Sequence, residues 1–228
     1  MKRMKGDGMP KPRPNLSGEG WPARRRAMVR TQIVKRGVDD PRVLAAMERV
    51  PREEFVPREE IDQACDDCPL PISCDQTISQ PFTVAYMAAA LNLRGTERVL
   101  EIGTGCGYGA AVLAELAAEV HTIERWPQLA HDARSRLKRL GYQNVHVHLG
   151  DGAQGLSEFA PYDAICVTAG AETLPPAYQR QLSLGGRLVI PIGDPGQGRQ
   201  MLKYTRRQDY FDLENLGNFA FVPLIGEG

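Results

Sequence analysis

The strongest constraint on the fold is the regular exchange of short β-branched segments and helical segments that begins at Arg98. Five segments have the length and residue types of strands: 98–103, 120–124, 145–150, 162–169 and 186–193. Two helical patterns separate the first three of them: 109–118 and 126–141. Strands that alternate with helices of this length form βαβ units, whose strands run parallel. We therefore predict an α/β fold with a Rossmann-like, doubly wound, mostly parallel sheet and helices on both faces.

The segments on either side of this core add further elements. Ahead of the core, the periodicity predicts three helices: 23–37, 40–50 and 82–93. Gly37 is a typical helix stop, Asp40 is a suitable helix cap, and Pro41 suits a first helical position. After the core, 200–207 and 219–225 read as strands with no helical pattern between them. We therefore predict antiparallel C-terminal strands and a helical N-terminal extension.

These patterns divide the chain into three parts. Residues 1–21 form a basic arm, 22–94 hold the N-terminal helices and an active-site loop, and 95–228 form the α/β core. We expect 22–228 to form one compact unit.

Three glycines mark a ligand site. Gly103, Gly105 and Gly107 directly follow the first predicted strand and precede a helix. Glycine allows a sharp turn and lets a ligand lie against the backbone, and the start of a helix offers free N–H groups. This placement predicts a nucleotide-like ligand. The glycines alone leave NAD open, because Gly105, Gly107 and Ala110 satisfy the loose dinucleotide fingerprint, with Glu124 at a suitable distance beyond them.

Two further acids favour another ligand. Glu101 lies two residues before the first glycine, where a carboxylate would repel a pyrophosphate but suits a ligand that carries a cation. Asp151 follows the third strand, where an aspartate can meet the exocyclic amine of adenine. Together with Glu124, this order of glycines and acids resembles the class I S-adenosylmethionine-dependent methyltransferases. The resemblance implies that Glu124 holds the ribose hydroxyls of that cofactor.

A narrower resemblance rests on longer stretches of sequence. "DQTISQPF", "VLEIGTGCGYGAAVLA", "APYDAICVTAG" and "GGRLVIPIG" are similar to stretches of the protein-L-isoaspartate O-methyltransferase family. The resemblance covers roughly residues 27–225, and "QTISQP" is highly specific to the family. It implies S-adenosylmethionine as cofactor and isoaspartyl-containing proteins and peptides as partners. The family methylates the α-carboxylate of L-isoaspartyl residues in damaged proteins, and the ester then closes to a succinimide that can reopen to aspartate.

The resemblance also assigns site residues. Ser79 corresponds to the active-site serine of the family, and Gln76, Thr77 and Ile78 belong to the loop where cofactor meets peptide. The cofactor-binding residues that it implies are Glu101, Gly103, Thr104, Gly105, Gly107, Glu124, Asp151 and Gly152. A carboxylate acceptor with a pKa near ~3.5 is already ionised at neutral pH and needs no general base. We therefore interpret Ser79 as a hydrogen-bond donor that aligns the carboxylate, and the alternative for the same motif is a helix cap.

One stretch departs from the family. A G-x-G pair usually precedes "QTIS", whereas this chain has Ser73, Cys74 and Asp75 there. The loss of two glycines predicts a changed loop backbone, and Asp75 predicts repulsion of an anionic substrate. We expect peptide specificity and rate to be affected more than cofactor binding.

Charge and cysteine usage bear on partners and compartment. The first 36 residues hold eleven lysines and arginines against Asp7 and Glu19. Such an arm can bind nucleic acid, but its Pro- and Gly-rich composition favours a solvated, disordered leader, so we expect no nucleic-acid partner. Five scattered cysteines argue against a disulfide framework, and no run approaches the roughly 20 apolar residues of a membrane span. We expect a cytoplasmic monomer that makes no contact with membranes.

Other interpretations stay open at this stage. A methyltransferase of the same fold can act on a small molecule or RNA, and the lost glycines are compatible with a cofactor-binding protein of little turnover. Cys65 and Cys68 have the spacing of metal ligands, but no second pair or nearby histidine accompanies them in the sequence. We therefore predict no metal site.

Overall fold

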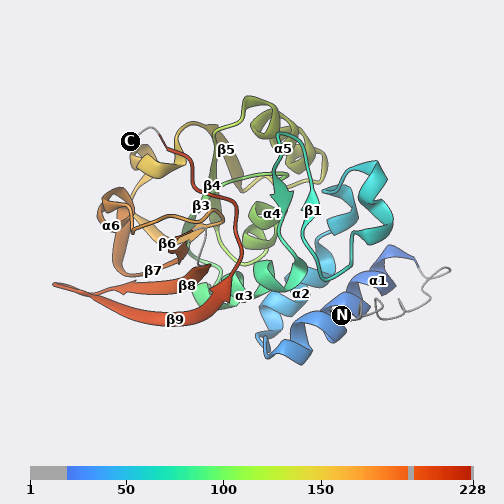
Figure 1. Cartoon of the computed structure of the whole chain (residues 1–228), viewed down its shortest axis with the longest axis horizontal. Helices are drawn as coiled ribbons and strands as arrows, with labels where there is room; N and C mark the ends of the chain where they lie inside the picture. The colour runs from blue at the N-terminus through green and yellow to red at the C-terminus, as the bar shows by residue number, and fades with distance from the viewer. Residues whose placement is uncertain (1–19, 195–197, 227–228) are drawn as a thin grey trace, which may run out of the picture.

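A seven-stranded sheet forms the centre of the protein (Figure 1). The computed structural model describes residues 20–194 and 198–226. The strand order is β5-β4-β3-β6-β7-β8-β9. The strands are β3 (Arg98–Ile102), β4 (Glu119–Glu124), β5 (Val145–Leu149), β6 (Tyr162–Val167), β7 (Leu182–Ile192), β8 (Arg199–Arg206) and β9 (Phe211–Phe219). Strands β3 to β7 pair in parallel, and β8 and β9 are antiparallel. The predicted α/β fold is confirmed.

Helices cover both faces of the sheet. They are α1 (Trp21–Met28), α2 (Pro41–Arg49), α3 (Pro81–Leu91), α4 (Tyr108–Ala114), α5 (Pro127–Arg139) and α6 (Pro176–Gln181). Consecutive strand residues point to opposite faces, so Val99 of β3 packs in the core with α1 to α5 while Leu100 packs in the core with α6. Two helical turns, Val29–Ile33 and Val34–Arg36, continue α1 within the helix predicted at 23–37. The helix α6 and four further helical turns were not predicted. These four turns are Arg52–Glu54, Arg58–Gln63, Gly152–Gln154 and Ser157–Phe159.

The N-terminal helices begin and end where the sequence indicates, within a residue or two. Gly37 ends the first helical segment with a left-handed φ of 92°, a conformation that glycine adopts without strain. The Asp40 side chain caps α2 by accepting from the backbone N–H of Arg42 at 2.8 Å. Helix α1 begins at Trp21, which packs against the main core. The predicted disordered arm, 1–21, otherwise falls on residues 1–19, outside the described part of the chain.

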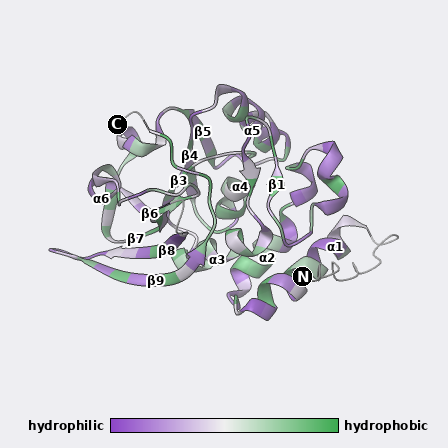
Figure 2. Cartoon of the chain, viewed as in Figure 1, coloured by the Kyte–Doolittle hydropathy of each residue, from purple (hydrophilic) through white to green (hydrophobic). Residues whose placement is uncertain are grey.

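The last predicted strand is wrong. The structure places β9 at Phe211–Phe219, and the apolar run 219–225 forms no strand beyond its first residue. Polar and apolar residues alternate irregularly along β9 (Figure 2), because most residues of this edge strand are exposed and it needs no continuous apolar face. The apolar run instead crosses the carboxyl end of the sheet, where Pro223 forms an isolated bridge with Gly170.

Within 20–194 and 198–226, no helix has the length and apolar character that crossing a bilayer requires.

Candidate active site

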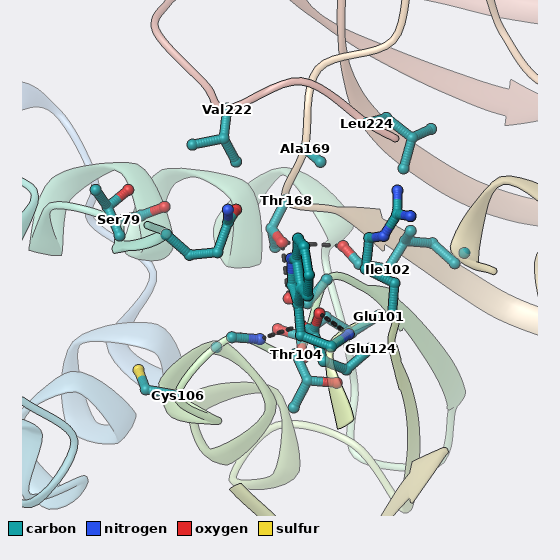
Figure 3. Close-up of a pocket in the computed structure, with 18 of the residues that line it drawn as sticks. Ser79, Glu101, Ile102, Thr104, Cys106, Glu124, Thr168, Ala169, Val222 and Leu224 are labelled. Atoms are coloured by element: carbon teal, nitrogen blue, oxygen red, sulfur yellow. Dashed lines mark hydrogen bonds between the residues drawn. The ribbon is translucent and has the colours of Figure 1, made fainter. Parts of the chain in front are cut away.

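A pocket lies at the carboxyl ends of β3, β4 and β6. The strand order reverses at this point, since β3 lies between β4 and β6, and open parallel sheets bind ligands at such a switch point. The pocket encloses about 870 Å³ of non-protein space, part of it open to solvent. In Figure 3, Ser79 lies on one side of the pocket, and Glu101 and Glu124 lie at its floor. Val222 and Leu224 form another wall of the pocket.

The loop after β3 must approach the neighbouring strand end closely. Gly103 has a φ of 93°, and a Cβ atom there would lie 2.5 Å from Oγ1 of Thr168. The Thr168 hydroxyl donates to the carbonyl oxygens of Ile102 at 2.9 Å and Gly103 at 2.8 Å. Only glycine fits this position, and Thr168 fixes the loop from the end of β6.

Glu124 holds the glycine loop from the end of β4. Its Oε2 accepts from the backbone N–H of Gly105 at 2.8 Å, and its Oε1 accepts from the N–H of Trp126 at 3.0 Å. A carboxylate has about four acceptor sites, so two remain for a ligand that donates hydroxyl groups. Glu124 is 6% exposed and lines the pocket, which leaves its free acceptor sites little access to bulk water.

Glu101 is a buried acid in the floor of the pocket. Its side chain is 1% exposed, and its Oε2 accepts from the hydroxyl of Thr122 at 2.6 Å, which in turn lies 2.7 Å from the hydroxyl of Thr104. Burial is the largest cause that raises the pKa of Glu101 to about 8; the hydrogen bond from Thr122 opposes this rise, and the nearby charge of Glu124 adds to it. A Cβ atom at Gly109 would overlap Oε1 of Glu101, so glycine is required beside the acid.

The "QTIS" stretch lies on a small hairpin. Strand β1 (Leu70–Pro71) pairs antiparallel with β2 (Thr77–Ile78), and Ser79 follows directly. The carbonyl oxygen of Ser79 accepts from Nη2 of Arg52 at 2.8 Å, so the backbone is fixed while the side chain faces the pocket (Figure 3). Ser79 is not a helix cap, because the N-cap of α3 is Gln80.

The hairpin turn has a backbone geometry that glycine favours, although it contains no glycine. Cys74 and Asp75 both have positive φ angles, 60° and 55°, and Gln76 N–H donates to the carbonyl of Ser73. Two central residues with positive φ define the type I′ turn of tight hairpins. Ser73, by contrast, has no positive φ. The turn is therefore built from two residues held in a conformation that costs L-amino acids conformational energy.

Most of the predicted site residues lie together in the pocket. The lining includes Gln76, Thr77, Ile78, Ser79, Glu101, Gly103, Thr104, Gly105, Glu124 and Gly152. Gly107 and Asp151 are not part of it: a Cβ atom at Gly107 would meet Leu137 of α5, and Oδ1 of Asp151 accepts from the N–H of Ala153 at 2.9 Å. The functional roles of all these residues stay predictions.

Two parts of the pocket lining were not predicted from the sequence: residues 222–225, and Thr168 and Ala169, which directly follow β6. The strand end has a recognisable signal, because it lies at the same edge of the sheet as the glycine loop. The segment 222–225 has none, since an apolar run reads equally as strand or pocket wall.

The cysteines form no metal site in the described residues. Cys65 and Cys68 are free thiols, as are Cys74, Cys106 and Cys166. No group of three or more His, Cys, Asp or Glu side chains in 20–194 and 198–226 has an arrangement that could hold a metal ion.

The chain is similar to known proteins over most of its length. The family model described as Protein-L-isoaspartate(D-aspartate) O-methyltransferase (PCMT) matches residues 23–228. A Marinobacter nauticus protein named Protein-L-isoaspartate O-methyltransferase 2 is 55% identical over 214 residues, covering 93% of this chain and 98% of the relative. A solved protein-L-isoaspartate O-methyltransferase has a TM-score of 0.80 at 30% identity, with 88% of this chain and 66% of that chain covered.

A second solved structure shows the same fold. It is a Plasmodium falciparum protein in complex with S-adenosyl-L-homocysteine, with a TM-score of 0.77 at 24% identity, and the match covers 88% of this chain and 98% of that chain.

Proposed function

The chain belongs to the protein-L-isoaspartate(D-aspartate) O-methyltransferase family, and we propose that its pocket transfers a methyl group from S-adenosylmethionine to the α-carboxylate of L-isoaspartyl residues. Family membership confirms the resemblance predicted from the sequence. The observation that carries the proposal is that the pocket has two chemically different parts, an acidic floor and a neutral mouth. Two buried acids, Glu101 and Glu124, line its floor, while the neutral donors of "QTIS" line its mouth.

The floor of the pocket fits S-adenosylmethionine. Among the described residues, the Thr122 hydroxyl is the one hydrogen-bond donor to Glu101, and a buried carboxyl with so little support is stabilised as an anion by a nearby cation. The free acceptor sites of Glu124 suit ribose hydroxyls. Glu101, Glu124 and the loop at 103–105 would therefore hold the cofactor. When bound, S-adenosylmethionine supplies an electrophilic methyl group on a sulfonium sulfur, which a carboxylate oxygen takes up as an ester.

The mouth of the pocket suits an anionic acceptor that needs no base. The hydroxyls of Ser79 and Thr77 are neutral donors, which orient a carboxylate without the tight ion pair that would weaken it as a nucleophile. Among the described lining residues the one cation is Arg125, and its Nη1 donates to the carbonyl of Ile225 at 2.9 Å. Ile78, 3% exposed, and Val222 exclude water from the acceptor.

The proposal also covers the compartment, the oligomeric state and the partners of the enzyme. Free thiols at all five cysteines suit a reducing compartment, which supports a cytoplasmic location. We propose that the enzyme works as a monomer on isoaspartyl proteins and peptides, without nucleic acid, and that 22–228 acts as one unit.

A paired-peptide assay tests the proposed function. An isoaspartyl peptide and its aspartyl twin are offered with methyl-labelled S-adenosylmethionine, and base-labile methyl ester is measured on each. We expect ester on the isoaspartyl peptide alone. Normal cofactor binding with ester on neither peptide would show that the acceptor is another molecule.

A further inference from the structure

The pocket wall at 222–225 belongs to no strand. Two hydrogen bonds join it to the loop after β6: Gly170 N–H donates to the carbonyl of Val222 at 2.8 Å, and Leu224 N–H donates to the carbonyl of Gly170 at 2.8 Å. Val222 and Leu224 both face the pocket, at the part of the molecule that Ser79 also faces (Figure 3). The position of this wall therefore depends on what fixes Gly170 and the residue before Val222.

Arg199, the first residue of β8, meets both requirements. Its Nη1 donates to the carbonyl oxygen of Phe221. Its side chain also fills the space beside Gly170, where a Cβ atom would lie 2.5 Å from Cζ of Arg199 and would overlap Cδ and Nε. Arg199 thus lies against the bare backbone of Gly170, and any larger residue at position 170 would displace it.

The guanidinium of Arg199 is buried with few partners. Arg199 is 4% exposed, its Nε lacks a hydrogen-bond partner, and no carboxylate of the described residues forms an ion pair with it. Burial of an unpaired cation lowers stability, so packing alone is a poor explanation for an arginine here. A planar guanidinium does combine two properties that this place requires: a flat face for the glycine and a donor for the carbonyl.

We propose that Arg199 is a positioning residue for the acceptor, which holds 221–225 against Gly170 so that Val222 and Leu224 present a fixed wall to the bound peptide. The proposal rests on the proposed function and refines it. Arg199 does not line the pocket and acts through the wall alone. The proposed cofactor residues Glu101 and Glu124 lie on β3 and β4, and their hydrogen bonds do not involve Arg199. We therefore expect the affinity for cofactor to change less than the affinity for peptide.

A double-mutant cycle tests the contact between the two residues. In Gly170→Ala the new methyl group would overlap the side chain of Arg199 and displace it. In Arg199→Ala the hydrogen bond to the carbonyl of Phe221 is lost. We expect each to raise the KM for isoaspartyl peptide at least about tenfold, with kcat and cofactor affinity changed less than about threefold. In the double variant Gly170→Ala adds no further increase, because the space is vacant. Arg199→Lys, which keeps a donor, restores part of the loss.

Arg187→Ala is the matched control. Arg187 also ties backbone carbonyls, those of Leu91 and Asn92, but far from the pocket lining. We expect a lower melting temperature with an unchanged KM. An unchanged KM in Gly170→Ala, or additive effects in the double variant, overturns the proposal. Loss of cofactor binding together with peptide binding in both single variants also overturns it, since Arg199 would then support the whole fold.

Hydrogen exchange tests the anchoring role of Arg199 without depending on which acceptor the enzyme methylates. The amides of Gly170 and Leu224 are hydrogen-bonded across the contact, so their exchange reports on the wall without any turnover. We expect faster exchange in Gly170→Ala and Arg199→Ala than in Arg187→Ala. Unchanged exchange in both variants overturns the anchoring role, even if the wild type methylates no isoaspartyl peptide.

Discussion

Arg52 donates a hydrogen bond from Nη2 to the carbonyl oxygen of Ser79 at a distance of 2.8 Å, although the arginine is completely buried. Its Nε donates to the carbonyl of Ala64 at 2.8 Å, and its guanidinium lies 4.6 Å from the ring centroid of Tyr108. The buried guanidinium of Arg52 therefore fixes the backbone of Ser79, while the side chain of Ser79 lines the pocket. In the proposed mechanism, Ser79 is therefore a hydrogen-bond donor whose position is fixed before the acceptor binds.

Ser79→Ala should lower kcat moderately and leave cofactor affinity nearly unchanged. One neutral hydrogen bond contributes about 0.5–1.5 kcal/mol, and backbone donors share the alignment of the carboxylate. Steady-state kinetics with calorimetry of cofactor binding check this. Ser73→Ala, on the same hairpin but outside the pocket lining, is the control with unchanged kinetics. Complete loss of turnover, with a trapped covalent intermediate, would instead make Ser79 a nucleophile.

Glu124→Ala should weaken cofactor binding at least tenfold. The variant loses the acceptor of ribose hydroxyls and also frees the N–H of Gly105, and a hydrogen bond to a charged group is worth about 1.5–3 kcal/mol. Calorimetry measures the change. Glu119→Ala removes an acid from the opposite end of the same strand, where it pairs with Arg98, and should bind cofactor normally. Equal affinity in both variants would remove Glu124 from the site.

Cofactor binding near neutral pH should release protons from Glu101. Because burial raises its pKa to about 8, this carboxyl is mostly protonated at pH 7 in the free protein, and a cationic ligand favours its ionised form. Calorimetry in buffers of different ionisation enthalpy measures the release, which should approach about one proton per ligand and disappear above pH 9. Glu101→Gln should release none, and an unchanged release in that variant would contradict the prediction.

The raised pKa of Glu101 also predicts how the stability of the free protein depends on pH. The folded state holds a proton on Glu101 that the unfolded state loses at about 4.5, so the free energy of unfolding falls as pH rises from 4.5 towards 8. Glu101→Gln should flatten this part of the profile. A decline of equal slope in the variant would assign it to other groups.

Asp75→Gly should stabilise the protein by about 1 kcal/mol and lower the KM for isoaspartyl peptide. The substitution relieves a residue held at a φ of 55° and removes a negative charge beside the mouth. Asp75→Asn separates the two effects, because it removes the charge and keeps a side chain in the turn. Ser73→Gly, at a position without a positive φ, should give no gain in stability. Denaturant unfolding and peptide kinetics measure both quantities.

The central sheet and the residues at the floor of the pocket could be predicted because local rules govern their positions. Strand and helix periodicity follow from burial of one face, and the glycines and acids of the floor follow their strands at fixed distances, as Glu101 and Gly103 do around the end of β3. The hairpin turn shows the limit of such reasoning. The sequence does not indicate that Cys74 and Asp75 adopt positive φ angles, because the pairing of β1 with β2 fixes the turn. The predicted change relative to the loop of the family stays a prediction.

The wall at 222–225 could not be predicted from local pattern. Its apolar run has the composition of a strand, and β9 has too little apolar character to be recognised as one. What decides between them is a contact with Gly170 and Arg199, which lie in other parts of the sequence. Nothing in the sequence around Gly170 or Arg199 indicates that either residue contacts the C-terminal segment.

The distance in sequence between the two sides of the mouth has a consequence for the order of folding. Ser79 and Val222 face one space, yet about 140 residues separate them, whereas the cofactor floor lies within 101–168. Closing the longer loop costs more chain entropy and comes later. During synthesis, the floor also leaves the ribosome before the wall does. If the proposed function holds, the growing chain forms the binding site for its methyl donor before it forms the binding site for the acceptor.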